Sequence, residues 1–409
     1  MIKTELLSPA GNIEKLKVAC HFGADAVYFA GKQFGLRAYA GNFSEQEIRE
    51  AFNLLHSMGK KGYVTVNVFP YDEDFPSLKE HLALLESVGA DGIIVSDPGV
   101  IALAKKEAPS LELHLSTQAN TLNSYSAAFW ADMGVKRLVL ARELSIDRIK
   151  KIRDALDPSV EIECFAHGAM CISYSGRCLL SNYLSGRDNY KGECVQACRW
   201  NYVIHEKSRD AREFPLEEDE RGAYIMNSHD LKTIDFLGEL IKAGVTSFKL
   251  EGRMKTAYYV ASVTDAYRRA LDAAGKDPDG YVCRPEWEEE LSLCSNRGFT
   301  SGFMKGGKGG AETIAYDDSK SEGGADFIAK VLGYDFDKRC VIIEQRNRFR
   351  VGDTLELMSP GRSVERISVR EIWNAEGERI EDAFRVQEIL MIPTEIEASE
   401  GDILRRRKV

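Results

Sequence analysis

The sequence has no hydrophobic run approaching the ~18 residues that a membrane-spanning helix needs. Its beginning, MIKTELLSPAG, contains no apolar signal segment, so we expect a reducing, cytoplasmic setting in which disulfides are disfavoured. Positive charge is also scarce, because 54 Lys and Arg residues face 64 Asp and Glu residues and leave a net charge of −10. A nucleic-acid partner would therefore need a local basic surface rather than a global attraction.

Several catalytic signatures are missing as well. No G-x-G-x-x-G follows the first predicted strand, which disfavours an open dinucleotide-binding sheet. The sequence contains no H-E-x-x-H, no G-x-S-x-G and no papain-type cysteine context, so no standard protease centre is evident. The glycine-rich segment NRGFTSGFMKGGKGG does not fit G-x-x-x-x-G-K-[ST], so we assign no P-loop.

What the sequence does contain is a concentration of cysteine. Four of its nine cysteines, at positions 171, 178, 194 and 198, follow the spacing C-x6-C-x15-C-x3-C. Four neighbouring thiolates suit zinc or an iron–sulfur cluster. Zinc sites usually pair their ligands as C-x2-4-C twice, and only the last two cysteines are so paired, which favours iron–sulfur. Four independently buried thiols are the alternative, because cysteine is often buried.

Short apolar strands alternate with amphipathic helices through most of the chain. Several of these helices end at a glycine before the next strand, as the turn between a helix and a strand requires. Eight such units predict a TIM-type (β/α)8 barrel over residues 1–278. The predicted strands cover residues 5–7, 26–29, 63–68, 92–95, 112–115, 137–140, 162–165 and 247–250.

The seventh unit of the predicted barrel is abnormally long. Its connection, residues 168–228, carries the cysteines, and long insertions in compact domains are usually functional. A helix over residues 231–243 is expected to complete the unit. Residues 279–324 read as a linker with a glycine-rich basic segment. Apolar and polar residues alternate over residues 325–409 in about six strand-like runs, which predicts a small antiparallel β-barrel. We expect its basic end, residues 405–408, to be a solvated tail.

In a barrel of this type the active site lies where the strands end. Polar groups follow nearly every predicted strand, and we assign catalytic roles to His167, Gln118, Glu251 and Arg253. We expect Arg253 to be a rim residue whose loss leaves folding intact. A structural ion pair between Glu251 and Arg253 is the alternative.

The run over residues 163–181, ECFAHGAMCISYSGRCLLS, closely resembles the signature of the collagenase-like peptidase family, of the U32 peptidase type. LLSPAG, STQAN, KLEGRMK and NRGFTSGF are also similar to that family, and the resemblance spans the whole chain. The resemblance is closest to the branch of the family that supports tRNA hydroxylation. It implies an iron–sulfur protein, with a 4Fe–4S cluster held by Cys171, Cys178, Cys194 and Cys198; the fourth ligand differs between members.

The resemblance further implies the reaction and its partners. The expected substrate is the wobble uridine of tRNA, converted to 5-hydroxyuridine with prephenate as the source of the hydroxyl group, and a homologous partner chain is a further implication. Arg142 and Arg177 would suit the carboxylates of prephenate, as would Arg253. Tyr174, Tyr183 or Phe303 would stack on the uracil. RNA would contact a basic strip formed by Lys255, Arg268, Arg269, Arg297, Lys305 and Lys308.

Three other functions stay open from the sequence. One is a peptidase in which His167 serves as a base. Another is a binding module whose cysteines hold a structural zinc ion. The third is hydroxylation of another RNA or of a quinone precursor, which other members of the family support.

Overall fold

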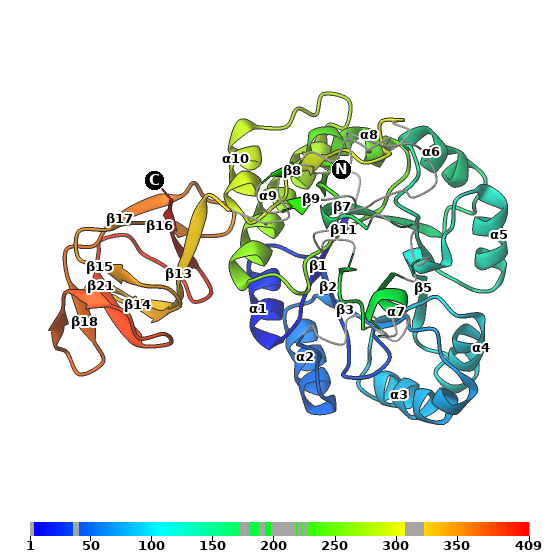
Figure 1. Cartoon of the computed structure of the whole chain (residues 1–409), viewed down its shortest axis with the longest axis horizontal. Coiled ribbons are helices and arrows are strands. Elements are labelled where there is room, and N and C mark those ends of the chain that lie inside the picture. The colour runs from blue at the N-terminus through cyan, green and yellow to red at the C-terminus, as the bar shows by residue number, and fades with distance from the viewer. Residues whose placement is uncertain are drawn as a thin grey trace.

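The structure is a computed structural model that describes residues 4–35, 41–171, 173, 178, 180–185, 187, 193–197, 218–219, 222–223, 228–306 and 323–408. None of the helices in these ranges is long and apolar enough to cross a membrane. The elements form a large barrel followed by a smaller domain of antiparallel strands, which lies beside the helices α9 (Ala257–Lys276) and α10 (Pro285–Leu293) in Figure 1.

Eight parallel strands form the closed barrel. They are hydrogen-bonded in the order β11-β1-β2-β3-β4-β5-β6-β7, and β11 also pairs with β7, which closes the sheet on itself. The predicted TIM-type fold is therefore confirmed. The strands are β1 (Glu5–Pro9), β2 (Ala26–Phe29), β3 (Lys61–Val66), β4 (Gly92–Val95), β5 (Glu112–Leu115), β6 (Arg137–Val139), β7 (Glu161–Ala169) and β11 (Ser247–Leu250).

Local sequence signals set the ends of the surrounding helices. Gly23, which follows the first helix, has a φ of +98°, a conformation that glycine adopts without a steric penalty. Ser44 and Glu47 form the capping box that their spacing predicts. Ser145 occupies the N-cap position before Ile146 without making a side-chain cap bond. The ring in Figure 1 includes α1 (Ile13–His21), α2 (Glu45–Ser57), α3 (Phe75–Ser87), α4 (Pro98–Glu107), α5 (Ser124–Asp132), α6 (Ile146–Asp154) and α8 (Leu237–Lys242).

The interior of the barrel is charged near its centre. Glu163 on β7 is fully buried, and its carboxylate accepts a hydrogen bond of 2.9 Å from Lys249 Nζ on β11. Arg137 Nη1 on β6 lies 3.4 Å from the other oxygen of Glu163 and also pairs with Glu5 on β1. Barrels of this type usually fill this space with Val, Ile and Leu. Glu163 is thus shared by two buried cations, and Arg137 is also paired with Glu5 and Glu161.

Strand β7 runs beyond the barrel and takes on a second partner. Its last residues pair antiparallel with β10 (Asp230–Lys232), with Asp230 opposite Ala169. The predicted helix over residues 231–243 is therefore wrong at its beginning, because these residues hydrogen-bond to the overhang of β7. A short 3₁₀ turn (Ile234–Phe236) and α8 complete the unit. Strand β12 (Phe299–Thr300) then pairs with β10.

Little of the insertion between β7 and β10 is described. It includes α7 (Leu180–Ser185) and the two-residue strands β8 (Glu218–Asp219) and β9 (Gly222–Ala223), which pair antiparallel. Two apolar stretches of the insertion, residues 200–205 and 223–226, suggest a hairpin from the sequence, but all of these positions except Ala223 lie outside the described residues.

The C-terminal domain is an antiparallel sheet with its own apolar core, which includes Ile328, Val341, Leu355 and Leu390. Its main sheet has the order β17-β16-β22-β13-β14-β21-β18-β19. The alternating run over residues 384–390 suggests a strand from the sequence, but the strand in this region begins only at Ile389. The strands are β13 (Ala325–Asp335), β14 (Cys340–Gln345), β15 (Phe349–Arg350), β16 (Thr354–Met358), β17 (Glu365–Ser368), β18 (Ile372–Asn374), β19 (Arg379–Ile380), β20 (Asp382–Ala383), β21 (Ile389–Pro393) and β22 (Ile403–Arg407).

Arg405 joins the two domains. Its side chain is fully buried, with Nε 2.8 Å from Glu356 of the C-terminal domain and Nη2 2.8 Å from Glu290 on α10. The expectation of a solvated or phosphate-binding basic tail is therefore wrong, because β22 is an inner strand of the sheet. The remaining basic residues of the tail also face carboxylates, namely Arg406 to Asp353, Arg407 to Glu356 and Lys408 to Asp326.

Candidate active site at the barrel mouth

Polar side chains at the ends of three neighbouring strands form one hydrogen-bonded group. Asn67 Nδ2 donates to Ser116 Oγ at 3.5 Å, and Ser116 Oγ donates to Gln118 Oε1 at 3.3 Å. Ser96 Oγ, after β4, donates to the main-chain oxygen of Asn67. The mouth of the barrel thus brings Gln118, whose side chain is mostly buried, together with residues that follow β3 and β4.

Arg253 lies on the other side of the mouth and is only 5 % exposed. Its Nη1 donates to Thr65 Oγ1 on β3 at 3.2 Å. Arg253 is thus packed more deeply than a rim residue, while the expectation that its loss leaves folding intact stays a prediction. Its main chain also comes close to the segment that follows β1. Gly11 permits this approach, since a Cβ there would lie 2.6 Å from the main-chain oxygen of Arg253.

Glu251 is linked to the charged interior through a tyrosine. Tyr28 OH on β2 lies 3.2 Å from Glu251 Oε2 and 2.9 Å from the main-chain oxygen of Leu250. The ring of Tyr28 is also 4.3 Å from Lys249 Nζ. Between Glu251 and Arg253, both of which are described, no ion pair forms.

His167 does not face the interior of the barrel. Phe165 pairs with Lys249 and His167 pairs with Leu250, so Ala166 is an extra residue on β7. Such a bulge reverses the alternation of the side chains. The ring of His167 consequently packs between β7 and α9, where its Nδ1 is 3.4 Å from Tyr267 OH. Its catalytic role stays a prediction, and this placement gives it little support.

We expect the His167 imidazole to stay neutral from pH 5 to pH 8. Burial, reinforced by Lys255 and Lys232, lowers its pKa to about 3. Because the folded pKa lies below the unfolded value of about 6.5, this group contributes stability that is complete above pH 6.5 and declines as pH falls toward 3. Ring chemical shifts of labelled histidine, followed by NMR against pH, measure this directly. A midpoint near pH 6.5 for His167 would show that the ring is solvated.

Arg142 and Lys249 flank the same aromatic ring. Arg142 lies 5.1 Å from the centre of the Phe165 ring and donates to the main-chain oxygen of Ala169 at 3.0 Å. Lys249 Nζ is 5.7 Å from the same centre. Sequence reasoning assigned no role to Lys249 or Glu163, although a charged residue inside each of two apolar strands was a usable signal. The other two substrate-binding predictions, Arg177 and Tyr174, lie outside the described residues.

Two of the four clustered cysteines meet the first turn of α7. Cys178 Sγ accepts a hydrogen bond from the main-chain nitrogen of Leu180 at 3.4 Å. Ser181 Oγ lies 3.8 Å from Cys194 Sγ and accepts from the nitrogen of Val195, which ties the two segments together. Cys171 follows β7 and is exposed, and Cys198 lies outside the described residues.

The arrangement of the described cysteines bears on which metal group they fit. Four thiolates about 2.3 Å from one zinc ion stand about 3.8 Å apart. Cys171, Cys178 and Cys194 do not form a set with sulfur atoms within 4.8 Å of one another. An iron–sulfur cluster is larger than a single ion and is held by thiolates, so this donor set fits a cluster better than zinc.

The remaining cysteines stand apart from this group. Burial raises the pKa of Cys20 to about 11 and that of Cys294 to about 12, so these thiols stay protonated at neutral pH. Cys283 lies near Asp235 and Glu288, a second group that could hold a metal ion, but Lys232 Nζ already pairs with both carboxylates.

RNA binding by the predicted basic strip stays a prediction, and most of its described cations are ion-paired. Its arginines and Lys305 are each neutralised by a carboxylate, and Lys255 Nζ donates to Ser295. Lys308 lies outside the described residues. The observed pairs are Arg268 with Asp25 and Asp272, Arg269 with Asp265, Arg297 with Asp230, and Lys305 with Glu239.

Comparison with known proteins adds two family matches and several long relatives. The family model described as Peptidase family U32 matches residues 11–313, and the Peptidase family U32 C-terminal domain matches residues 324–405. The tRNA hydroxylation protein P1 of Bacillus subtilis (strain 168) is 39% identical over 406 residues, covering 99% of this chain and 95% of that protein. The tRNA hydroxylation protein P of Escherichia coli (strain K12) is 35% identical over 451 residues, covering 99% and 97%.

One further relative has a different name. A Collagenase of Porphyromonas gingivalis (strain ATCC BAA-308 / W83) is 31% identical over 415 residues, covering 98% of this chain and 97% of that protein. The similarity of the chain thus extends over both of its domains in relatives with either name.

Proposed function

The chain belongs to peptidase family U32, and on that premise we propose that it is an iron–sulfur enzyme that hydroxylates tRNA. Its substrate in this proposal is the wobble uridine, which becomes 5-hydroxyuridine, with prephenate as the source of the hydroxyl group. The observation that carries the proposal is the similarity, over nearly the whole chain, to two proteins named for tRNA hydroxylation.

The cysteines provide the place for the cluster. Cys171, Cys178 and Cys194 are three of its ligands in this proposal, with Cys198 as the fourth. When bound, the cluster would supply the electron exchange that oxygen transfer to a uracil requires. The contacts of Ser181 and the nitrogen of Leu180 would hold two of the sulfur atoms in position. Hydrogen bonds of this kind to ligating sulfur also tune the potential of such clusters.

The barrel mouth supports the binding of an anionic co-substrate. Arg253 and Arg142 follow β11 and β6 and bring two guanidinium groups to the mouth, where Arg253 donates to Thr65 and Arg142 to the main-chain oxygen of Ala169. Guanidinium groups bind carboxylates through two parallel hydrogen bonds. A molecule with two carboxylates, as prephenate has, suits this set of cations.

Nucleoside analysis tests the reaction itself. tRNA from a strain lacking the gene should contain no 5-hydroxyuridine derivatives unless a second pathway exists, and the purified protein with prephenate should restore them. Iron and sulfide in equal amounts after anaerobic purification would support the cluster. One zinc per chain and unchanged nucleosides would instead support a zinc-stabilised binding module.

We expect Arg253→Lys to lower kcat/KM for tRNA hydroxylation by about 100-fold, because displacement of a positioning group costs on that order. Lysine keeps the charge but loses the two-pronged geometry of the guanidinium group. Arg269→Lys, which changes an ion-paired arginine on α9 outside the mouth, should retain full activity. Steady-state kinetics measures the loss of activity of each variant, and thermal melting shows whether the variant has also lost stability. Full activity of Arg253→Lys would remove Arg253 from the site.

A peptidase is the second candidate function, and the relative named Collagenase favours it. Burial of His167 against α9 gives no support to a base positioned at the mouth. Hydrolysis of gelatin by the purified protein, abolished by a point change at the barrel mouth, would favour this second function over the first.

A further inference from the structure

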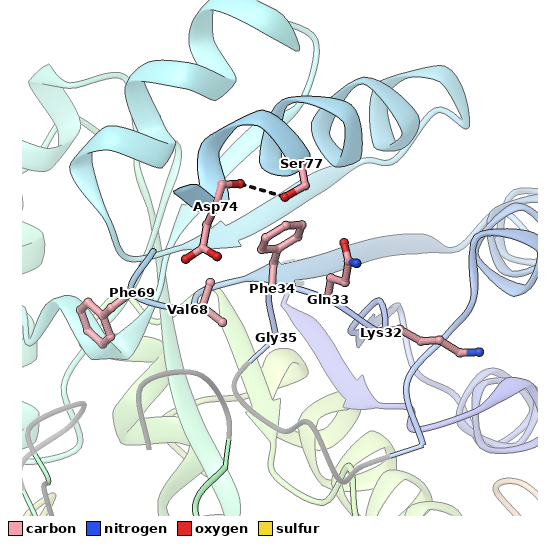
Figure 2. A pocket seen from close by; sticks show the side chains of 8 residues that line it. All are labelled: Lys32, Gln33, Phe34, Gly35, Val68, Phe69, Asp74 and Ser77. Carbon is pink, nitrogen blue, oxygen red and sulfur yellow. Dashed lines mark hydrogen bonds between the residues drawn. The ribbon is translucent and has the colours of Figure 1, made fainter. Parts of the chain in front are cut away.

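A hollow of about 280 Å³ opens beside the barrel mouth, between the segments that follow β2 and β3 (Figure 2). Phe34 and Gln33 contribute from the first segment, and Val68, Phe69 and Asp74 from the second. In Figure 2 the ring of Phe34 lies in the centre, the Asp74 carboxylate faces the same space, and Lys32 extends toward the outer edge. The hollow thus combines an aromatic surface, a hydrogen-bond acceptor and a peripheral cation.

Phe34 is held in a conformation that is unusual for a bulky residue. Its φ is +63°, in the left-handed region, where a Cβ is sterically disfavoured. Its main-chain oxygen accepts hydrogen bonds from the nitrogens of Asn67 at 3.1 Å and Val68 at 3.4 Å. Strain of this kind persists where the surroundings enforce it, and such positions cluster at functional sites.

The Phe34 ring packs against a neutral side chain, that of His81. The ring of His81 on α3 lies 5.5 Å from that of Phe34, and burial lowers the pKa of His81 to about 4. His81 is therefore neutral at physiological pH. The charged groups that line the hollow are Asp74 and Lys32.

The hollow adjoins the mouth through a single residue. A Cβ on Gly35 would lie 3.3 Å from Thr65 Oγ1 and 3.9 Å from Arg253 Nη1. Gly35 also lines the hollow, so this one residue separates the hollow from Arg253. A ligand with two adjacent flat groups could place one in each space.

We propose that this hollow holds a second unstacked base of the RNA substrate, one that carries an exocyclic amino group; this inference rests on the proposed function. Single-stranded RNA is recognised by stacking on aromatic rings and by hydrogen bonds to base edges. Phe34 provides the stacking surface, Asp74 accepts a hydrogen bond from the amino group, and Lys32 lies near the backbone phosphate. A carboxylate can accept several hydrogen bonds, so the bond from the nitrogen of Tyr71 to Asp74 does not exclude another.

Modified anticodon stem-loops test the inference. At each loop position in turn, adenine, guanine or cytosine is replaced by its analogue without the amino group. With the wild-type protein, one replacement should lower kcat/KM for hydroxylation by about tenfold or more, since a hydrogen bond to a charged group is lost. With Asp74→Ala, which has no side-chain acceptor, natural and modified loops should react alike. Glu73→Gln, an exposed neighbour outside the hollow, should keep the wild-type discrimination.

Phe34→Gly provides a variant that does not depend on Asp74. Glycine adopts a positive φ without strain but loses the packing of the ring against the core, so the melting temperature should fall modestly, while KM for the stem-loop should rise by about tenfold as one stacking contact is lost. If the wild-type protein discriminates among no amino-group replacements, or if both variants behave as wild type, the inference is overturned while the proposed function stands. If the wild-type protein forms no product, the proposed function fails and the inference fails with it.

Discussion

Cys178→Ala, purified without oxygen, should retain less than about a tenth of the wild-type iron and should not hydroxylate tRNA. The cluster in our proposal depends on thiolates, and alanine offers no ligand atom. Binding of the metal group also stabilises the segment that holds it, so the insertion should become more sensitive to proteases. Iron analysis, the visible absorbance of the cluster and limited proteolysis follow these effects separately.

A cysteine outside the cluster serves as the matched control. Cys283 is half-buried, and burial raises its pKa to about 11, so its thiol stays protonated at neutral pH. Cys283→Ala should keep the full iron content and activity. If Cys178→Ala keeps its iron, the proposed ligands are wrong. If Cys283→Ala loses iron instead, the group near Asp235 is the metal site.

Glu163→Ala should lower the free energy of unfolding by about 3–5 kcal/mol, because it removes the carboxylate paired with the buried Lys249 and one of the three carboxylates paired with Arg137. Glu161→Ala is the control on the same strand. Its side chain is 46% exposed and also pairs with Arg137, so its loss should cost less than about 1 kcal/mol. Urea denaturation of both variants gives the comparison. Equal effects at the two positions would show that the charged interior is solvated.

The stability that Glu163 contributes should also depend on pH, and the direction of its pKa shift fixes the sign of this dependence. Burial alone would raise the pKa of Glu163, but Lys249 and Arg137 outweigh it and hold the pKa below its ordinary value. The stability it contributes is therefore present above the unfolded pKa, near 4.3, and is lost as pH falls through the lower folded pKa. The difference in unfolding free energy between wild type and Glu163→Ala should accordingly shrink in acid. A constant difference down to pH 2 would contradict this assignment.

Much of the barrel could be predicted because its signals are local. The strands over residues 26–29, 92–95, 112–115 and 247–250 have the predicted bounds, since a short apolar run between polar turns marks a buried parallel strand. Glycine after a helix and the Ser44–Glu47 pair depend only on neighbouring residues. Such features need no knowledge of distant contacts.

The wrong predictions concern features that depend on contacts with residues far away in the sequence. The beginning of the predicted helix over residues 231–243 is a strand because the end of β7 offers hydrogen bonds to it. Arg405 is buried because Glu290 and Glu356 meet it at the junction between domains. The alternation of apolar and polar residues and the distribution of charge along the chain cannot reveal such contacts.

The antiparallel pairing of β7 with β10 has a consequence for how this family can vary. Leu231 pairs with Gly168 and Lys232 with His167, so both ends of the segment over residues 170–229 are fastened to each other within the sheet. For a loop whose ends are already joined, doubling its length costs only about 0.6 kcal/mol in closure entropy. Evolution can thus lengthen, shorten or replace the cysteine-bearing segment with little effect on the stability of the barrel. The same property makes this junction a suitable place to graft the corresponding segment from a relative.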